Sequence, residues 1–490
     1  PGEAAKWKSL GGGLVSAASP AAMTEKVYAI DARQAGRSLD YGVGVVVAGG
    51  DFDSIGGVTA KNIAMWDGSS WHAMGAGLND NVYAVLVDPW SGEIFAGGSF
   101  TASGSGAEAV AVAGVAKWNP NTESWEPLEQ GVDGIVFAIE RSYDDYQIYI
   151  GGNFQHAIDS SGTQLDTPAL VTWDGEVLGD PQAGLSSGDT VRSLYSAGAY
   201  ADSCNGSMLV AGNFTVDGAQ NFGRFAYGYW DRVQVSSSPS AGVSAAVERY
   251  NNAAQGCDIA VALNGGSSSS IEGTSIQAAG MFSNYFNYQG SLNWIDLSGA
   301  GTFFDTEEGT SAVAMDGHYT YFGGYLTSTS DPNLNSVFRV PTLSKASQLA
   351  SYNANESLAQ PMGGGVNGAV YALSIDPQGN VWAGGRFNHA MLADGSSISG
   401  TAGIARFGEP VPAPPSSPSL AFSATTFEEA VANDGSTTDV LTATLTDDTF
   451  TGTNGDTFAD VVTNVPAGLT AVVTRTSDTT VTLALTGNAT

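Results

Sequence analysis

The chain has 490 residues, of which 42% are hydrophobic, and it carries 49 Asp and Glu against 17 Lys and Arg, a formal net charge of −32. A surface this acidic repels nucleic acid and anionic membranes, so we expect no nucleic-acid partner and no direct membrane insertion. The hydrophobic content is enough for a packed core and excludes a disordered chain. With 64 Gly and 13% charged residues, the composition is typical of a secreted, loop-rich all-β protein.

A hydrophobic strand that runs into Gly-Gly-x-Phe recurs along the chain, and its copies lie 44 to 68 residues apart. The seven copies, three of them degenerate, end at Phe52, Phe100, Phe154, Phe214, Phe282, Leu326 and Phe387. A period of this length indicates a repeat architecture and suits a four-stranded blade with variable loops.

The second copy shows the complete unit in chain order. An alternating strand at 82–87 is followed by the turn DPWSG, and IFAGGSF at 94–100 is the next strand. The third strand is expected at 114–118 and the fourth from Trp125. Since turn residues separate these segments and none has a helical period, the unit predicts a four-stranded antiparallel sheet.

The glycine pair and the aromatic residues of the repeat are interpreted as packing. Small residues allow neighbouring sheets to approach closely, and the following Phe can fill the space between them. We therefore expect a core between sheets rather than a ligand-stacking platform at the recurring aromatic positions Phe52, Phe100, Phe154, Phe387, Trp66, Trp118 and Trp173.

The two ends of the repeat region complement each other. Residues 4–14 match the end of a unit without its beginning, and the last unit, 370–407, lacks a fourth strand. We expect Trp7 to Leu10 to pair as the outermost strand of that last sheet, because such closure removes free sheet edges. Residues 1–408 are therefore predicted to form a seven-bladed β-propeller with N-terminal strand closure.

The repeat resembles that of kelch-like extracellular β-propellers of bacterial surface proteins, and is similar to the propellers of fungal cortical polarity markers. The motifs that carry the resemblance are Gly-Gly-x-Phe, IAMWDG at 63–68 and WKSLGGGL at 7–14. Units four to six depart from it, with Ala211 and Ala279 in place of the first glycine. The resemblance implies a fold and an extracellular scaffold, and no particular reaction.

Beyond the repeats, residues 409–419 are a Pro- and Ser-rich linker. Residues 420–490 contain short Thr- and Val-rich strands separated by Asn, Asp and Gly. This segment resembles the Ig-like β-sandwich modules of bacterial surface proteins. It is short for a complete sandwich, so we expect an incomplete module.

Few residues suggest chemistry. Cys204 and Cys257 both fall between first and second strands of adjacent units and could form a disulfide, the alternative being two unpaired thiols. An acidic tract with Asp447, Asp448, Asp456 and Asp460 could bind Ca²⁺, although it lacks the spacing of an EF-hand and a solvated loop is favoured. No other cofactor is predicted.

The four histidines, His72, His156, His318 and His389, lie in different units without metal-ligand spacing. A GxSxG motif is centred on Ser186, but it links two strands rather than a strand and a helix, which argues against a nucleophile. Asp88 and Asp376 occupy hairpin turns, and turn formation accounts for them.

These observations predict a non-enzymatic protein of the cell surface. The propeller is expected to serve in adhesion, as an interaction head or as a subunit of a filament or layer, through self-association or through other surface proteins and glycans. The alternative is a carbohydrate-binding or carbohydrate-active propeller, a lectin or a glycoside hydrolase. A hydrolase would need paired carboxylates at equivalent loop positions, and the sequence shows no regular set of them.

Overall fold

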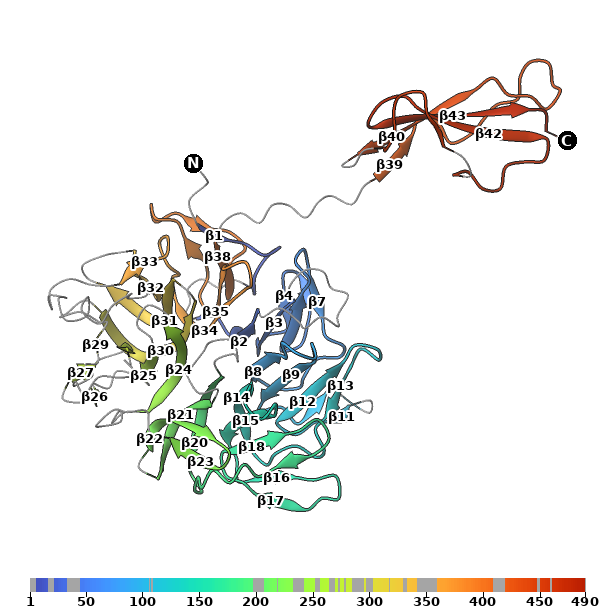
Figure 1. The fold of residues 1–490 in the computed structure, drawn as a ribbon. Coiled ribbons are helices and arrows are strands. Elements are labelled where there is room, and N and C mark those ends of the chain that lie inside the picture. The colour runs from blue at the N-terminus through green and yellow to red at the C-terminus, as the bar shows by residue number, and fades with distance from the viewer. Residues whose placement is uncertain are drawn as a thin grey trace. The chain divides into compact units, whose positions relative to one another are not determined.

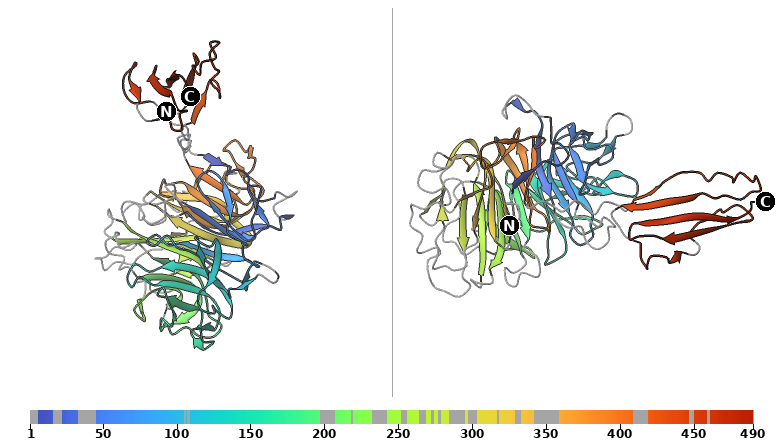
Figure 2. Two further views of the ribbon diagram at one scale, coloured as in Figure 1. Left: turned by 90° about the vertical axis from the view of Figure 1, so that its right-hand side faces the viewer. Right: turned by 90° about the horizontal axis from the view of Figure 1, so that it is seen from above.

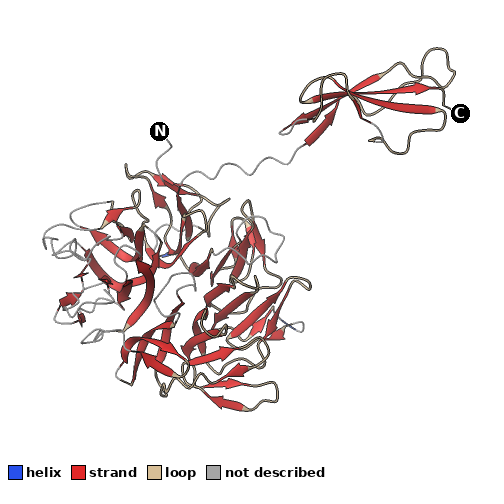
Figure 3. Cartoon of the chain, in the orientation of Figure 1, coloured by secondary structure: helices blue, strands red, loops and turns tan. Residues whose placement is uncertain are grey.

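The chain is all-β. The computed structural model describes residues 6–15, 22–32, 45–104, 106, 109–196, 207–217, 219–231, 242–251, 256–263, 269–271, 274–276, 279–283, 295–296, 303–316, 318–328, 333–341, 359–408, 419–446, 450–458 and 461–489. In these ranges the regular structure is strand, with no α-helix (Figure 3). The chain divides into two compact units, Pro1–Glu409 and Pro410–Thr490.

The first unit is built from four-stranded antiparallel sheets, seven in the described residues. Sheet 1 has β2 (Lys26–Asp31), β3 (Val46–Asp51), β6 (Ile63–Trp66) and β7 (Trp71–Ala73); sheet 2 has β8 (Val82–Val87), β9 (Ile94–Gly98), β12 (Val115–Asn119) and β13 (Ser124–Pro127). Sheet 3 has β14 (Ile135–Arg141), β15 (Ile148–Asn153), β18 (Leu170–Trp173) and β19 (Leu178–Gly179); sheet 4 has β20 (Thr190–Ser196), β21 (Met208–Val216), β22 (Ala219–Ala226) and β23 (Tyr229–Asp231). Sheet 5 has β24 (Val243–Asn251), β25 (Gly256–Leu263), β28 (Ala279–Ser283) and β29 (Ile295–Asp296); sheet 6 has β30 (Phe303–Met315), β31 (Tyr319–Ser328), β32 (Val337–Pro341) and β33 (Gln360–Pro361). Sheet 7 has β34 (Ala369–Ile375), β35 (Val381–Arg386), β38 (Ile404–Gly408) and β1 (Lys6–Lys8).

Short hairpins lie between the second and third strands of several sheets. They are β4 (Ser54–Ile55) with β5 (Val58–Thr59), β10 (Ala102–Ser103) with β11 (Val110–Ala111), β16 (His156–Ile158) with β17 (Gln164–Asp166), β26 (Ser269–Ile271) with β27 (Thr274–Ile276), and β36 (Ala390–Met391) with β37 (Ser397–Ile398).

Consecutive sheets are neighbours in space. Their first strands contact one another in the order β2, β8, β14, β20, β24, β30 and β34, and β34 in turn contacts β2. In Figure 1 these first strands lie toward the middle of the unit, with the later strands of each sheet farther out, and Figure 2 gives two further views of the same sheets. Among the described residues, hydrophobic clusters lie between each sheet and the next, so the sheets bury side chains on both faces.

The recurring glycine pair has two steric causes. A Cβ atom on the first glycine would lie 2.5 Å from Val82 at Gly49 and 2.4 Å from Val136 at Gly97, both in the first strand of the next sheet. A Cβ atom on the second glycine, Gly50, would lie 2.0 Å from the carbonyl oxygen of Lys26, beside a β-bulge in the partner strand. The glycines therefore allow close approach of the sheets, as the sequence predicts.

The aromatic core expected from the repeat is largely confirmed. Phe52, Phe100, Phe154 and Phe387 are at most 2% exposed, and the indoles of Trp66 and Trp173 are also buried. Trp118 differs, since it is only partly buried and its ring faces a groove.

The fifth copy of the repeat was assigned to the wrong strand. IQAAGMF, ending at Phe282, contributes β28, the third strand of sheet 5, and the second strand is β25. Across the bulge in β24, Ala262 holds the position that Gly49 holds across the bulge in β2. An alanine can replace the first glycine because it is still small. Ala-Gly-x-Phe stands in β28, one strand later in its sheet than Gly-Gly-x-Phe stands in sheet 1.

The N-terminal segment joins the two ends of the repeat region, as predicted, with a shorter strand. β1 pairs antiparallel with β38, and Trp7 lies opposite Phe407. The Trp7 ring is 1% exposed and packs edge-on against Phe407, with ring centroids 5.2 Å apart. The chain then leaves the sheet, and the carbonyl of Leu10 accepts a hydrogen bond of 3.0 Å from the Trp71 indole in sheet 1.

The second unit differs from the expected sandwich. Its described residues form one five-stranded antiparallel sheet, where a sandwich needs two. The strand order is β39 (Ser419–Phe422), β40 (Val440–Thr446), β43 (Thr480–Gly487), β42 (Leu469–Arg475) and β41 (Thr457–Phe458). The buried apolar residues among those described in this unit are few, namely Leu441, Ala443, Val473 and Val481. Leu420 and Phe422 stay about half exposed, at 47% and 52%.

Candidate functional site

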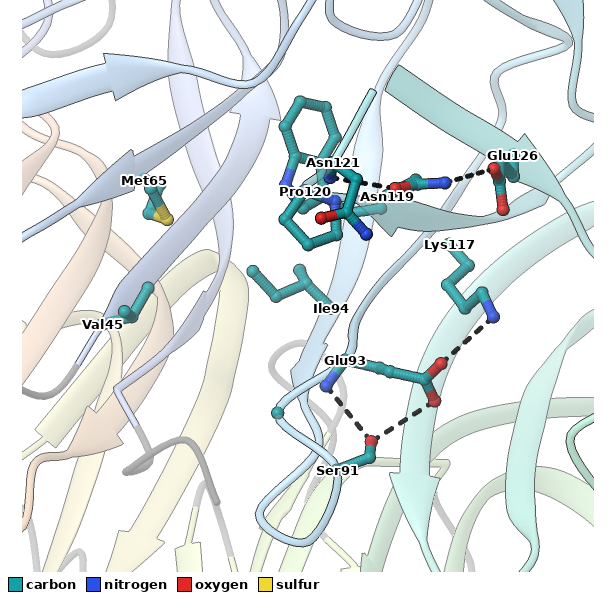
Figure 4. Close-up of a pocket in the computed structure, with 12 residues that line it drawn as sticks. Val45, Met65, Ser91, Glu93, Ile94, Lys117, Asn119, Pro120, Asn121 and Glu126 are labelled. Carbon is teal, nitrogen blue, oxygen red and sulfur yellow. Dashed lines mark hydrogen bonds and ion pairs between the residues drawn. The ribbon is translucent and has the colours of Figure 1, made fainter. Parts of the chain in front are cut away.

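A groove of about 330 Å³ lies between sheets 1 and 2. Val45 and Met65 line it from sheet 1, and Ile94 lines it from β9 of sheet 2 (Figure 4). Trp118 in β12 adds an aromatic wall. The Trp118 ring packs against Trp125 with centroids 5.4 Å apart, so its orientation is held from behind.

Polar side chains lie around this apolar floor. The Lys117 ammonium is 3.1 Å from Glu93, whose other carboxylate oxygen accepts a hydrogen bond of 3.3 Å from the Ser91 hydroxyl (Figure 4). The Asn119 amide donates to Glu126 over 2.7 Å. Apolar walls with a few convergent polar groups are typical of small-molecule sites.

The sequence analysis missed this site. Trp118 recurs at the same repeat position as Trp66 and Trp173, which favoured packing. Lys117 and Asn119 alternate with it along β12 as in any half-exposed strand. Only the contact with Val45 and Met65 of the preceding sheet turns these residues into a groove.

The structure describes one of the four candidate calcium ligands. Asp456 accepts hydrogen bonds from the Thr453 amide (2.7 Å) and hydroxyl (3.0 Å), which close a turn and lower the pKa of its carboxyl. Asp447, Asp448 and Asp460 lie outside the described residues. Among the residues that are described, no three His, Cys, Asp or Glu side chains gather as a metal site.

The cysteine prediction needs one correction. Cys257 belongs to β25 itself, where its backbone pairs with Tyr250, and not to the loop before the strand. Its side chain lies outside what the structure describes, as does the whole of Cys204, so the disulfide stays a prediction.

The histidines are held locally in separate loops. His72 is 2.7 Å from Asp67, and His156 is 2.6 Å from Asp133. His389 lies 3.3 Å from the Asn367 amide. The backbone amide of His318 donates to Asp316 over 2.6 Å. These bonds order turns and bring no two histidines together.

Ser186 is exposed in the link between β19 and β20, where its amide donates to Asp189 over 2.7 Å. Asp376 accepts from the Asn380 amide N–H at 2.8 Å and from the Trp382 indole at 3.0 Å, which confirms its role in a turn.

Asp88 stabilises the β8–β9 turn and also forms an ion pair between sheets 2 and 3. It is fully buried and accepts hydrogen bonds from Ser91 (2.6 Å) and from Arg141 Nε of sheet 3 (3.1 Å). Burial alone would raise the pKa of Asp88, but the bonds from Arg141 and Ser91 outweigh it and lower that pKa. Asp88 therefore fastens sheet 2 to sheet 3.

No family model and no curated protein matches the chain. Among solved structures, the extracellular domain of a hybrid two-component system from B. thetaiotaomicron is similar, with a TM-score of 0.41 and 12% identity. The alignment covers 97% of this chain and 46% of that domain, so the chain spans less than half of its length. No helix in the described residues is long and apolar enough to cross a membrane.

Proposed function

We propose that the first unit is a seven-bladed, kelch-like β-propeller and that it acts as a non-enzymatic interaction head of an extracellular surface protein. The observation that carries the proposal is the contact order of the first strands, which returns from β34 to β2, together with the pairing of β1 with β38. A closed ring of sheets leaves few free edges and presents its loops on a rigid frame.

The second unit, Ig-like in its sequence, is proposed as a spacer or an assembly joint. Its sheet has a small core and leaves apolar side chains such as Phe422 half exposed. Exposed apolar surface of this kind is typical of a contact region. In this proposal the chain attaches to, or assembles on, a cell surface as part of a filament or layer.

Charge supplies the test. At −32, copies packed together repel one another unless cations screen them. Sedimentation velocity across a salt and Ca²⁺ series, with electron microscopy of the same samples, should show assembly that grows with ionic strength and loosens on chelation or dilution of salt. A protein that stays monomeric throughout, and does not attach to cell-wall material, would count against the proposal.

A second candidate is carbohydrate binding at the groove between sheets 1 and 2. The observation that favours it is an indole, Trp118, beside the Glu93–Lys117 pair and Asn119, an arrangement that can stack on a sugar ring and bond its hydroxyls. A glycan array with the Trp118→Ala protein beside wild type tests it, because binding at the groove must be lost in the variant. A turnover screen on the same glycans separates a lectin from a hydrolase.

A further inference from the structure

Four large aromatic side chains are exposed on connecting turns of sheets 2, 3 and 4. Trp90 lies on the β8–β9 turn and is 50% exposed; Tyr146 lies on the β14–β15 turn and is 54% exposed. Tyr227 and Tyr229, on and next to the β22–β23 turn, are 66% and 77% exposed. In an antiparallel sheet the first and third connections leave from the same end, so these turns share one end of their sheets.

The aromatic residues are linked across the three sheets. The rings of Trp90 and Tyr146 meet edge to face with centroids 4.9 Å apart. The hydroxyl of Tyr227 donates to the carbonyl oxygen of Asp144 over 3.2 Å. Trp90, Tyr146 and Tyr227 thus form one aromatic ledge, and exposed apolar surface of this kind marks interaction sites.

A buried ion pair holds this ledge in place. Arg141 binds the buried Asp88 of the neighbouring turn, with Nε 3.1 Å from Oδ1, and it also donates to the backbone carbonyl of Tyr146. One guanidinium therefore fixes the two turns that carry Trp90 and Tyr146. A surface that is already ordered loses little entropy on binding.

An acidic groove of about 400 Å³ adjoins Tyr227. Asp145, Asp174 and Asp180 line it, and no Lys or Arg is among its described lining residues. Asp145 is oriented by the hydroxyl of Tyr149, 2.8 Å away. Next to it, the Asp144 carboxylate has no cationic partner in the part of the chain that the structure describes.

Among the residues that the structure describes, no Lys or Arg compensates the negative charge of this groove. Desolvation and then the charge of Asp145 raise the pKa of Asp144. Desolvation and then the charges of Asp144 and Asp145 raise the pKa of Tyr227. Arg141 does not offset this potential, because its guanidinium is bound to Asp88.

We propose that the ledge of Trp90, Tyr146 and Tyr227, with the acidic groove beside it, binds a lysine- and arginine-rich segment of a partner protein. Aromatic faces attract ammonium and guanidinium groups, and carboxylates form charge-assisted hydrogen bonds with them. A neutral glycan could stack on the rings, but it carries no positive charge to pair with the three groove carboxylates, which have no Lys or Arg beside them among the described lining residues. With 17 basic residues against 49 acidic ones, a second copy of this chain offers few basic groups to this site, so the partner bound at the ledge is a different protein.

This inference rests on the proposed interaction role and adds the site and the class of partner. The test is fluorescence anisotropy of the full chain with a fluorescein-labelled deca-lysine peptide. We expect salt-sensitive binding that weakens about tenfold in Asp144→Asn/Asp145→Asn and in Trp90→Ala/Tyr227→Ala. Asp53→Asn/Asp394→Asn removes two exposed carboxylates from sheets 1 and 7, and Tyr325→Ala removes an exposed ring from sheet 6; both proteins are controls away from the ledge and should bind like wild type.

Equal weakening in the controls would mean general attraction to an acidic protein and would overturn the site. Binding of neutral hexasaccharides of glucose or N-acetylglucosamine at the ledge, without binding of deca-lysine, would overturn the class of partner. Salt-dependent assembly of the chain is measured without the peptide. Assembly retained by variants that have lost peptide binding therefore separates this inference from the proposed function.

Discussion

Closure of the repeat region by its first strand can be tested with one substitution, Trp7→Ala. Trp7 is 1% exposed, lies opposite Phe407 in the β1–β38 pair, and donates its indole N–H to the Met362 carbonyl over 2.5 Å. Emptying a buried Trp site costs about 3–5 kcal/mol of unfolding free energy. The Met362 carbonyl, left without its donor, adds about 1 kcal/mol. We therefore expect a loss of roughly 4–6 kcal/mol.

Hydrogen exchange gives the sharper measurement. If β1 closes the sheet, Trp7→Ala should accelerate amide exchange in β38 (Ile404–Gly408) more than in the central strands of sheet 3. Trp7→Phe, which keeps a ring and loses the N–H, should cost about 1–2 kcal/mol in urea unfolding. Trp90→Ala is the control for loss of an exposed indole. Trp7→Ala protein no less stable than Trp90→Ala protein would refute the closure.

Three further predictions concern the core and its charges. Phe100→Ala should lower the unfolding free energy by about 3–5 kcal/mol in urea denaturation, and an unchanged midpoint would show that the ring is not core. Gly97→Ala should destabilise by about 1–3 kcal/mol, because its Cβ would lie 2.4 Å from Val136. Gly57→Ala, which meets nothing within 4 Å and carries only the strain of its own positive φ of 79°, a strain absent at Gly97, is the comparison without overpacking. The pKa of Asp88 is lowered in the folded protein, so its carboxylate contributes stability above its unfolded pKa of about 3.9, and this stability is lost as the pH falls through the lower folded value. Asp88→Asn should therefore flatten the acid limb of a stability–pH curve, and an unaltered limb would contradict the role of the Asp88–Arg141 pair.

The sequence by itself determined the features that depend on local pattern. Three local signals predict the four-stranded unit: turn residues, alternating apolar positions and the Gly-Gly-x-Phe motif. Each of them spans only a few residues, so the sequence predicts the unit in sheets 1, 2, 3 and 7. The sequence also shows that residues 4–14 match the end of a unit and that the last unit lacks its fourth strand after Phe407. Together these two observations predict the pairing of β1 with β38, which the structure has.

Where the local pattern weakened, the assignment failed. In sheet 5 the position of the first glycine is held by Ala262 of β25, whereas Ala-Gly-x-Phe falls in β28, the third strand. Small size is the physical requirement at that position, and several residue types satisfy it. In residues 420–490 the strand pattern predicts strands but not the number of sheets that they form.

Only the tertiary structure decided which side chains meet across sheets. Trp118 repeats the position of two buried tryptophans, yet its exposure depends on how Val45 and Met65 of the preceding sheet lie beside it. Trp90, Tyr146 and Tyr227 are unremarkable turn residues in the sequence. They become one surface because consecutive sheets pack side by side and the Arg141–Asp88 pair holds two of their turns together. Contacts between residues this far apart in the chain produce no periodic pattern in the sequence.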